Sequence, residues 1–80
     1  MWKSTVIRDT DDSDVSTSTA TWTDPDPNLG VFQYSRRVNR RSPTDENDFV
    51  SEANAARDVW AIEQARLNSA GTDLDTKLNA

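Results

Sequence analysis

SPTDENDFVSEANAARDVWAIEQARL, residues 42–67, is the stretch that decides the fold, because it has the periodicity of an amphipathic helix. At about 100° per residue, five apolar side chains fall within an arc of roughly 60°. They are Phe49, Ala53, Ala56, Trp60 and Leu67, with Val59 on one flank. A stripe of this kind has to be buried against another part of the protein. The rest of the chain is therefore expected to supply its cover.

The start of this helix carries a capping signal. Ser42 is placed as the capping residue, Pro43 as the first helical residue, and Asp45 where it can close a capping box. The Ala-rich sequence that follows favours helix propagation, and Asn68 to Gly71 is a stop signal. The sequence thus predicts one long helix over about residues 43–68.

The C-terminal segment, residues 71–80, is treated separately. Thr72 offers a second cap, and Leu74 and Leu78 lie one helical turn apart. This segment is too short to be a stable helix by itself. It is expected either to fold back on the core or to form an arm or short helix that orders on a partner.

Three segments before the helix alternate with a period of two, as strands do. They are residues 1–9, 15–23 and 31–38, separated by DTDDSD and DPDPNLG. The middle segment, VSTSTATWT, also has the composition of a flexible Ser/Thr linker. Ala20 and Trp22, spaced by two, favour a strand, which gives a hairpin over residues 15–38 with a loop of about seven residues.

The alternation gathers the large apolar side chains on one face of the predicted sheet. These are Trp2, Val6, Ala20, Trp22, Phe32, Tyr34 and Val38. An antiparallel sheet with one wet face needs a cover on the other. The predicted fold is therefore α+β: a two- or three-stranded antiparallel sheet covered by one helix, forming a single domain over residues 1–70.

Composition limits what such a chain can do. Eighty residues bury a modest core, and the sequence contains no cysteine and no histidine. Disulfides, thiolate metal sites and the commonest general base are therefore absent. Oligomerisation or docking on a larger partner is the expected supplement to the core. No apolar run has the length of a signal peptide or membrane span, so a soluble protein with no membrane partner is expected.

The net charge of −5 is unevenly distributed along the chain. Residues 1–30 carry −4, residues 31–42 carry +4, and residues 43–80 carry −5. The positive segment contains four arginines, Arg36, Arg37, Arg40 and Arg41. Three interpretations are open: they pair with acids of the same chain, bind a protein partner, or bind nucleic acid. Nucleic acid is the least favoured, because the chain is acidic overall and only Tyr34 lies near for stacking.

The acidic turn from Asp9 to Asp14 resembles the opening of a calcium loop, but its spacing fails. An EF-hand loop needs glycine at its sixth position and glutamate at its twelfth, where this chain has Asp14 and Ala20. A solvated turn is the preferred interpretation, and no metal or cofactor is expected. The sequence sets no general base beside a nucleophilic side chain, and it contains no glycine-rich phosphate-binding loop. Enzymatic activity is therefore not expected.

The pattern STATWTDPDPNLGVFQYSRRV followed by FVSEANAARDVW resembles small accessory proteins encoded among the structural and tail genes of tailed bacteriophages. The resemblance covers roughly residues 15–62. It implies a virion component attached to larger structural proteins through an exposed sheet edge and a free tail.

These observations lead to a non-enzymatic structural or assembly protein as the expected function, located in the virion or otherwise in the cytoplasm. Homo-oligomerisation is a further possibility. The residues expected to bind the partner are Arg36, Arg37, Arg40 and Arg41 by charge, and Trp2, Leu74 and Leu78 by apolar insertion. Two alternatives remain at this point. One is an acidic inhibitor that imitates nucleic acid, as counter-defence proteins do, and the other is a small nucleic-acid-binding module that uses the arginine cluster.

Overall fold

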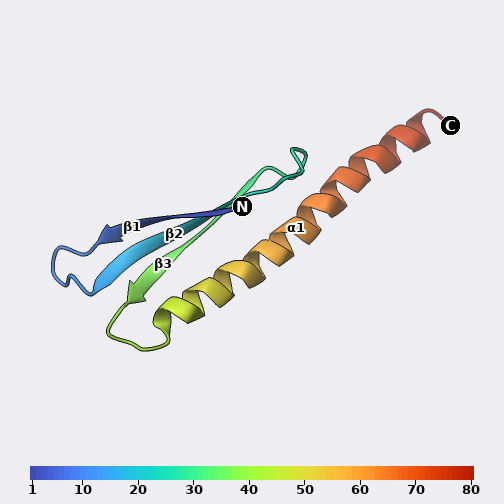
Figure 1. Ribbon diagram of the computed structural model, residues 1–80. Helices are drawn as coiled ribbons and strands as arrows, with labels where there is room; N and C mark the ends of the chain where they lie inside the picture. The colour runs from blue at the N-terminus through green and yellow to red at the C-terminus, as the bar shows by residue number, and fades with distance from the viewer.

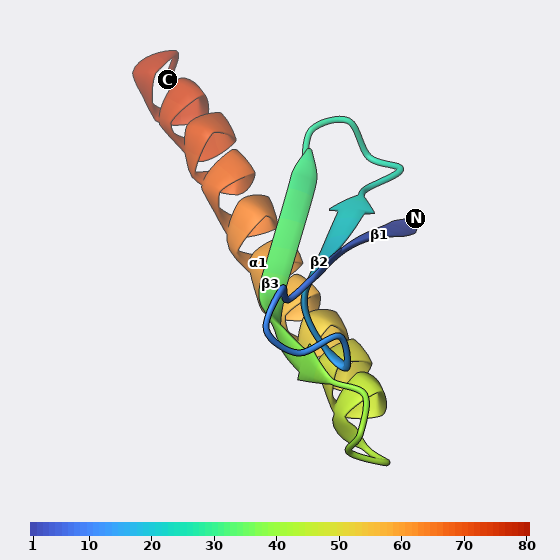
Figure 2. The same ribbon diagram turned by 90° about the vertical axis from the view of Figure 1, so that its left-hand side faces the viewer.

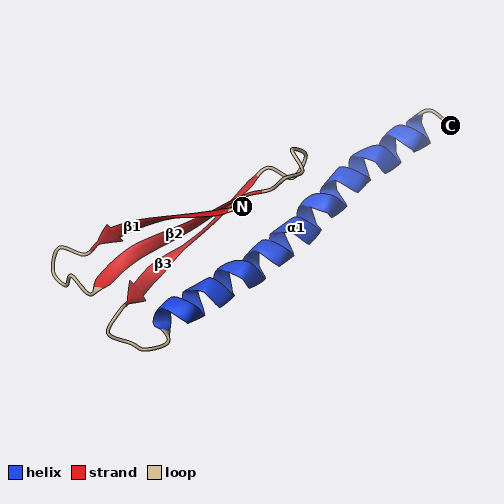
Figure 3. Cartoon of the chain, viewed as in Figure 1, coloured by secondary structure: helices blue, strands red, loops and turns tan.

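The computed structural model describes residues 1–80 and contains one sheet and one helix. The sheet consists of β1 (Trp2–Arg8), β2 (Val15–Thr23) and β3 (Val31–Asn39). The helix, α1, spans Asp45–Leu78. The predicted α+β architecture is confirmed, with three strands rather than two (Figures 1 and 3).

The three strands form an antiparallel meander in the order β1-β2-β3. Its register places Trp2 opposite Trp22, and Trp22 opposite Phe32. Ala20 likewise faces Tyr34. The aromatic residues therefore lie side by side across the sheet, as their period-two spacing predicts. Gly30 closes the β2–β3 loop with a φ of 90°, a conformation that glycine adopts without strain.

The core between the sheet and α1 is very small. Only four apolar side chains are buried: Ala20, Val38, Phe49 and Ala53. Around them, Trp2 and Tyr34 are partly buried. Val6, which we expected on the covered face, is exposed, because α1 packs chiefly against β3 and leaves β1 at the margin.

Two serines of β2 also lie on the covered face. Ser16 and Ser18 are buried, and their hydroxyl groups lie 3.2 Å apart. They belong to the same period-two alternation as Ala20 and Trp22, so all four side chains are on one face of the strand. Their small side chains fill the part of the sheet near Val38, and each hydroxyl has a hydrogen-bond partner.

The predicted helix boundaries are wrong at both ends. The N-cap is Thr44, which makes no side-chain capping bond, so the Ser42 cap does not form. The carboxylate of Asp45 turns back toward the sheet and accepts a hydrogen bond from the backbone N–H of Asn39 at 2.7 Å. It is therefore not free to close a capping box.

At the other end, the helix does not stop at Asn68 to Gly71. It continues through Gly71 to Leu78, and its C-terminal part projects past the sheet and the β2–β3 loop (Figures 1 and 2). No proline interrupts the chain after Pro43, so backbone geometry permits this continuation. The C-terminal segment is thus part of α1 and does not fold back on the core.

Candidate interaction surfaces

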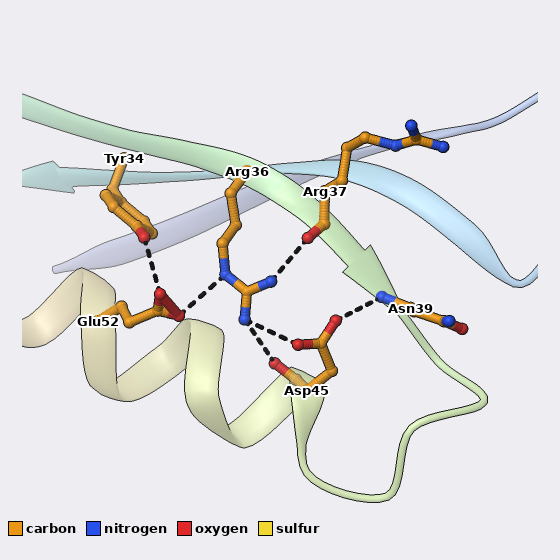
Figure 4. A network of polar contacts seen from close by, with 6 residues as sticks. All are labelled: Tyr34, Arg36, Arg37, Asn39, Asp45 and Glu52. Carbon is orange, nitrogen blue, oxygen red and sulfur yellow. Dashed lines mark hydrogen bonds and ion pairs between the residues drawn. The ribbon is translucent and has the colours of Figure 1, made fainter.

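The first candidate surface is the arginine segment at the end of β3. The side chain of Arg36 reaches across to α1, where its Nε donates to Glu52 Oε2 and its Nη2 donates to Asp45 Oδ1, both at 2.9 Å (Figure 4). Its Nη1 donates to the backbone carbonyl of Arg37 at 2.7 Å. Tyr34 donates to the other oxygen of Glu52 at 3.3 Å. This network ties β3 to the first two turns of the helix.

The electrostatics of this network follow from its contacts. The hydrogen bond from Arg36 lowers the pKa of Asp45, and the N–H of Asn39 lowers it further. The same bond to Asp45 raises the pKa of Arg36. Partial burial raises the pKa of Tyr34, and the neighbouring Glu52 carboxylate adds to this effect. All three groups therefore keep their usual neutral-pH charge states.

The other arginines of the segment also have partners within the chain. Arg37 donates to Asp9 at 2.7 Å, Arg40 to Glu46 at 3.0 Å, and Arg41 to Asp12. Arg41 also lies 3.8 Å from Asp14. The acidic turn and the start of α1 thus supply carboxylates to all four arginines. Of the three interpretations of this segment, the pairing with acids of the same chain is the one that the structure contains.

These outer pairs remain accessible. The side chains of Arg37 and Arg41 are well exposed, and such surface pairs contribute only about 0–1 kcal/mol each. They can exchange their partners for an external acidic group at little cost. Arg36, held by two carboxylates against the helix, is the least available of the four.

The second candidate for partner binding is Trp2, and the structure places its ring within a row of aromatic side chains. Its ring centroid lies 5.4 Å from that of Trp22 and 6.5 Å from that of Phe32. Its Nε1 donates to Asn54 of α1 at 3.3 Å. The row ends at Trp60, whose ring lies 5.5 Å from Phe32. Trp2 therefore has a packing role within the chain.

Arg57 of α1, which the sequence reasoning did not single out, lies against this aromatic row. Its guanidinium carbon is 4.5 Å from the ring centroid of Trp22 and 5.5 Å from that of Trp2. Contacts of this geometry are attractive cation–π interactions. Trp22 in turn donates to Asp24 at 3.0 Å, and this bond lowers the pKa of Asp24.

The third candidate surface is the projecting part of α1. Leu67 is 49% exposed, Leu74 61% and Leu78 81%. We expected Leu67 and its flanking neighbour Val59 to be covered, and both are exposed. Val59 lies about 80° around the helix from Phe49, and Leu67 lies about two turns beyond Trp60, whose ring contacts Phe32 of the sheet. The leucines continue the stripe of Phe49 and Trp60, so one face of α1 runs from the core into solvent.

A sequence signal for this continuous face exists. Trp60, Leu67 and Leu74 are spaced by seven residues, which keeps them on one side of a helix. The stop signal at Gly71 hid this pattern, because it assigned Leu67 and Leu74 to different segments.

The surface also has three open hollows. The largest, about 550 Å³, lies between the β2–β3 loop and α1 and is lined by residues such as Asn28, Leu29 and Asn68. Two smaller ones, about 200 and 210 Å³, lie between β1 and α1 and share Ser4, Phe49 and Val50.

No three acidic, histidine or cysteine side chains are grouped so that they could hold a metal ion. Although α1 is 34 residues long, it lacks the long apolar run of a membrane-crossing helix. Comparison with protein-family models, curated proteins and solved structures finds no match to this chain.

Proposed function

We propose that this chain is a non-enzymatic structural or assembly protein that works by associating with other protein chains. The observation that carries the proposal is the uncovered apolar face of the projecting helix, with Leu67, Leu74 and Leu78 in solvent. A soluble chain that leaves such residues aligned on one rigid element gains stability when another surface covers them. The small core gives the same chain little stability of its own.

The carboxylates and arginines support this proposal over a catalytic or nucleic-acid-binding one. Arg36 is held by Asp45 and Glu52 of the same chain, so phosphate binding by this arginine would have to break two ion pairs. The net charge of −5 also opposes association with a polyanion. Among the exposed carboxylates of α1, that of Asp58 pairs with Arg57 and that of Glu63 with Arg66, rather than with a second carboxylate across a cleft.

The site of action proposed is a virion, in which the chain is a minor component bound to larger structural proteins. This part rests on the resemblance of residues 15–62 to accessory proteins of tailed bacteriophages. The exposed guanidinium groups of Arg37 and Arg41 are suited to acidic neighbours in such an assembly.

The test is co-sedimentation of the chain with particles purified from its source, quantified by mass spectrometry across a density gradient. We expect a fixed ratio of this chain to the major particle protein through the particle peak. The Leu74→Glu variant is expected to lower that ratio, because a charge replaces an apolar contact. Recovery of the wild-type chain only in slowly sedimenting fractions would refute the proposal.

A further inference from the structure

We infer that the partner seated on the projecting part of α1 is a second copy of this chain, paired antiparallel through this helix. The inference rests on the proposed function, because it names the occupant of the same uncovered face. The face, called here the helix strip, extends from Val59 to Leu78. Its members are Val59, Glu63, Leu67, Ala70, Leu74, Lys77 and Leu78, which fall within an arc of roughly 100°.

The helix strip is free over its whole length. Val59, Leu67, Leu74 and Leu78 are all exposed. The β2–β3 loop contacts this part of the helix through Asn68, whose Nδ2 donates to the carbonyl of Asn28 at 3.2 Å. Asn68 lies about 100° around the helix from Leu67, so the loop flanks the strip without covering it.

The shape of the chain selects an antiparallel arrangement. The sheet packs beside the stripe as far as Trp60, whose ring contacts Phe32. In a parallel pair both sheets would lie at the same end of the two helices, where each would crowd the partner helix at the start of the contact. In an antiparallel pair the sheets lie at opposite ends and the free segments meet. The resulting two-fold symmetry makes every contact occur twice.

The apolar residues of the strip are complementary to themselves in this arrangement. When the pair is centred between Asn68 and Ser69, Leu67 of one copy is level with Ala70 of the second, Val59 is level with Leu78, and Leu74 is level with Glu63. In the first two layers a large side chain faces a smaller one, as interdigitated helices require. In the third, Leu74 packs on the aliphatic stem of Glu63 while its carboxylate stays at the edge in solvent.

The charges along the strip match in the same register. Within one chain Arg66 pairs with Glu63, so the dimer would exchange that exposed pair for contacts to the second copy. Asp73 makes no ion pair within the chain, and it lies on the same flank of the strip as Arg66. The centring given above brings Arg66 of one copy next to Asp73 of the second. Glu63 and Lys77 are the charged members of the strip, and Glu63 of one copy comes within one turn of Lys77 of the second, which lacks a partner in the chain. Flanking pairs of this kind set the orientation of helix pairs.

Pairing through the helix strip leaves the sheets free at the two ends of the dimer. The exposed guanidinium groups of Arg37 and Arg41 then remain available to larger neighbours. The dimer would present two identical sets of these groups, one at each end of a helical rod.

The experiment is sedimentation velocity of the purified chain from about 1 μM to about 1 mM, where affinities of this kind are resolved. We expect the mass to rise with concentration to twice the 9.0 kDa of one chain. Leu74→Glu should raise the dimer dissociation constant at least ten-fold. The matched control is Ile62→Glu, because Ile62 is more exposed than Leu74 and lies about 120° away from it around the helix. This control should leave the constant unchanged.

A charge exchange tests the register. Arg66→Asp and Asp73→Arg should each weaken the dimer several-fold, and the double variant should recover most of the loss, since it restores opposite charges at both contacts. Circular dichroism checks that each variant keeps its helix. Equal weakening by Leu74→Glu and Ile62→Glu would refute the strip as the interface. A wild-type chain that stays monomeric at about 1 mM would refute self-pairing, while co-sedimentation with particles would still decide the proposed function.

Discussion

Replacing Phe49 by alanine tests whether the whole fold depends on one ring. Phe49 is 8% exposed and lies at the centre of the core with Ala20, Val38 and Ala53. Its ring centroid is 5.6 Å from that of Tyr34, so it also joins the helix to β3. The other buried apolar side chains, those of Ala20, Val38 and Ala53, are all smaller than the phenylalanine ring.

The magnitude follows from the loss of a buried ring. A Phe-to-Ala change in a core costs about 3–5 kcal/mol, through lost burial and the cavity that remains. An 80-residue domain has a total stability of about 4–12 kcal/mol, and a core of this size places this chain toward the lower end. We therefore expect Phe49→Ala to remove most of the stability, or to unfold the chain without denaturant.

Urea unfolding is the appropriate assay, followed by circular dichroism at 222 nm for the helix and by tryptophan fluorescence for the sheet–helix packing. At a slope of about 1 kcal/mol/M, the expected loss lowers the urea midpoint by about 3–5 M. All measurements need one fixed protein concentration, because self-association adds stability that depends on concentration.

Val50→Ala is the matched control, since it changes the neighbouring residue on the same helical turn. Val50 is 54% exposed, so its replacement should change stability by no more than about 0.5 kcal/mol. A loss below about 1 kcal/mol for Phe49→Ala would show that the buried cluster does not hold the helix to the sheet.

Three further substitutions test separate features. Asp45→Asn should lower stability at neutral pH and flatten its fall below about pH 4, because Arg36 lowers the folded pKa of Asp45 and the stabilisation is lost as the pH falls through that pKa; acid titration of the unfolding free energy measures this. Gly71→Ala should raise the helical signal at 222 nm and add about 0.5–1 kcal/mol to helix stability, since a Cβ there meets no atom within 4 Å; a loss of helix would contradict a continuous α1. Arg57→Met should cost about 0.5–1 kcal/mol and shift the tryptophan emission, because the charge over Trp22 is removed while the stem remains; an unchanged spectrum would contradict the contact.

The strands could be predicted nearly to the residue because their signals are local. Alternation in 15–23 and 31–38 is bounded by turns rich in Asp, Asn, Pro and Gly, and the observed strands are Val15–Thr23 and Val31–Asn39. The side on which the helix packs also followed from the sequence, since Phe49 and Ala53 are buried against the face of Ala20 and Val38.

The helix ends could not be predicted because they depend on contacts made elsewhere. Ser42 has the chemistry of a cap, but the capping position depends on where Asp45 is held, and that residue is held by Arg36 and the N–H of Asn39. At the other end, Gly71 has the character of a stop, and propensity alone does not decide whether a helix already nucleated by packing continues through it.

The individual ion pairs could not be predicted from the sequence either. The pattern of charges predicted that the arginines could meet carboxylates of the same chain. It could not say that Arg37 meets Asp9 while Arg41 meets Asp12, because this depends on how the β1–β2 turn approaches the end of β3. Arg57 was missed for the same reason, since its aromatic partners come from two strands distant in sequence.

The end of α1 links the fold to the proposed association. Residues 68–73, NSAGTD, are mostly poor helix formers, and no part of the sheet supports the helix beyond the β2–β3 loop. The leucines at 67, 74 and 78 nevertheless keep one face of the helix apolar through this weak stretch. In the monomer these leucines are about half exposed or more, so burial within the chain adds little to its stability. Their alignment has a physical use when a second surface buries them, and that burial supplies the helical stability that residues 68–73 lack.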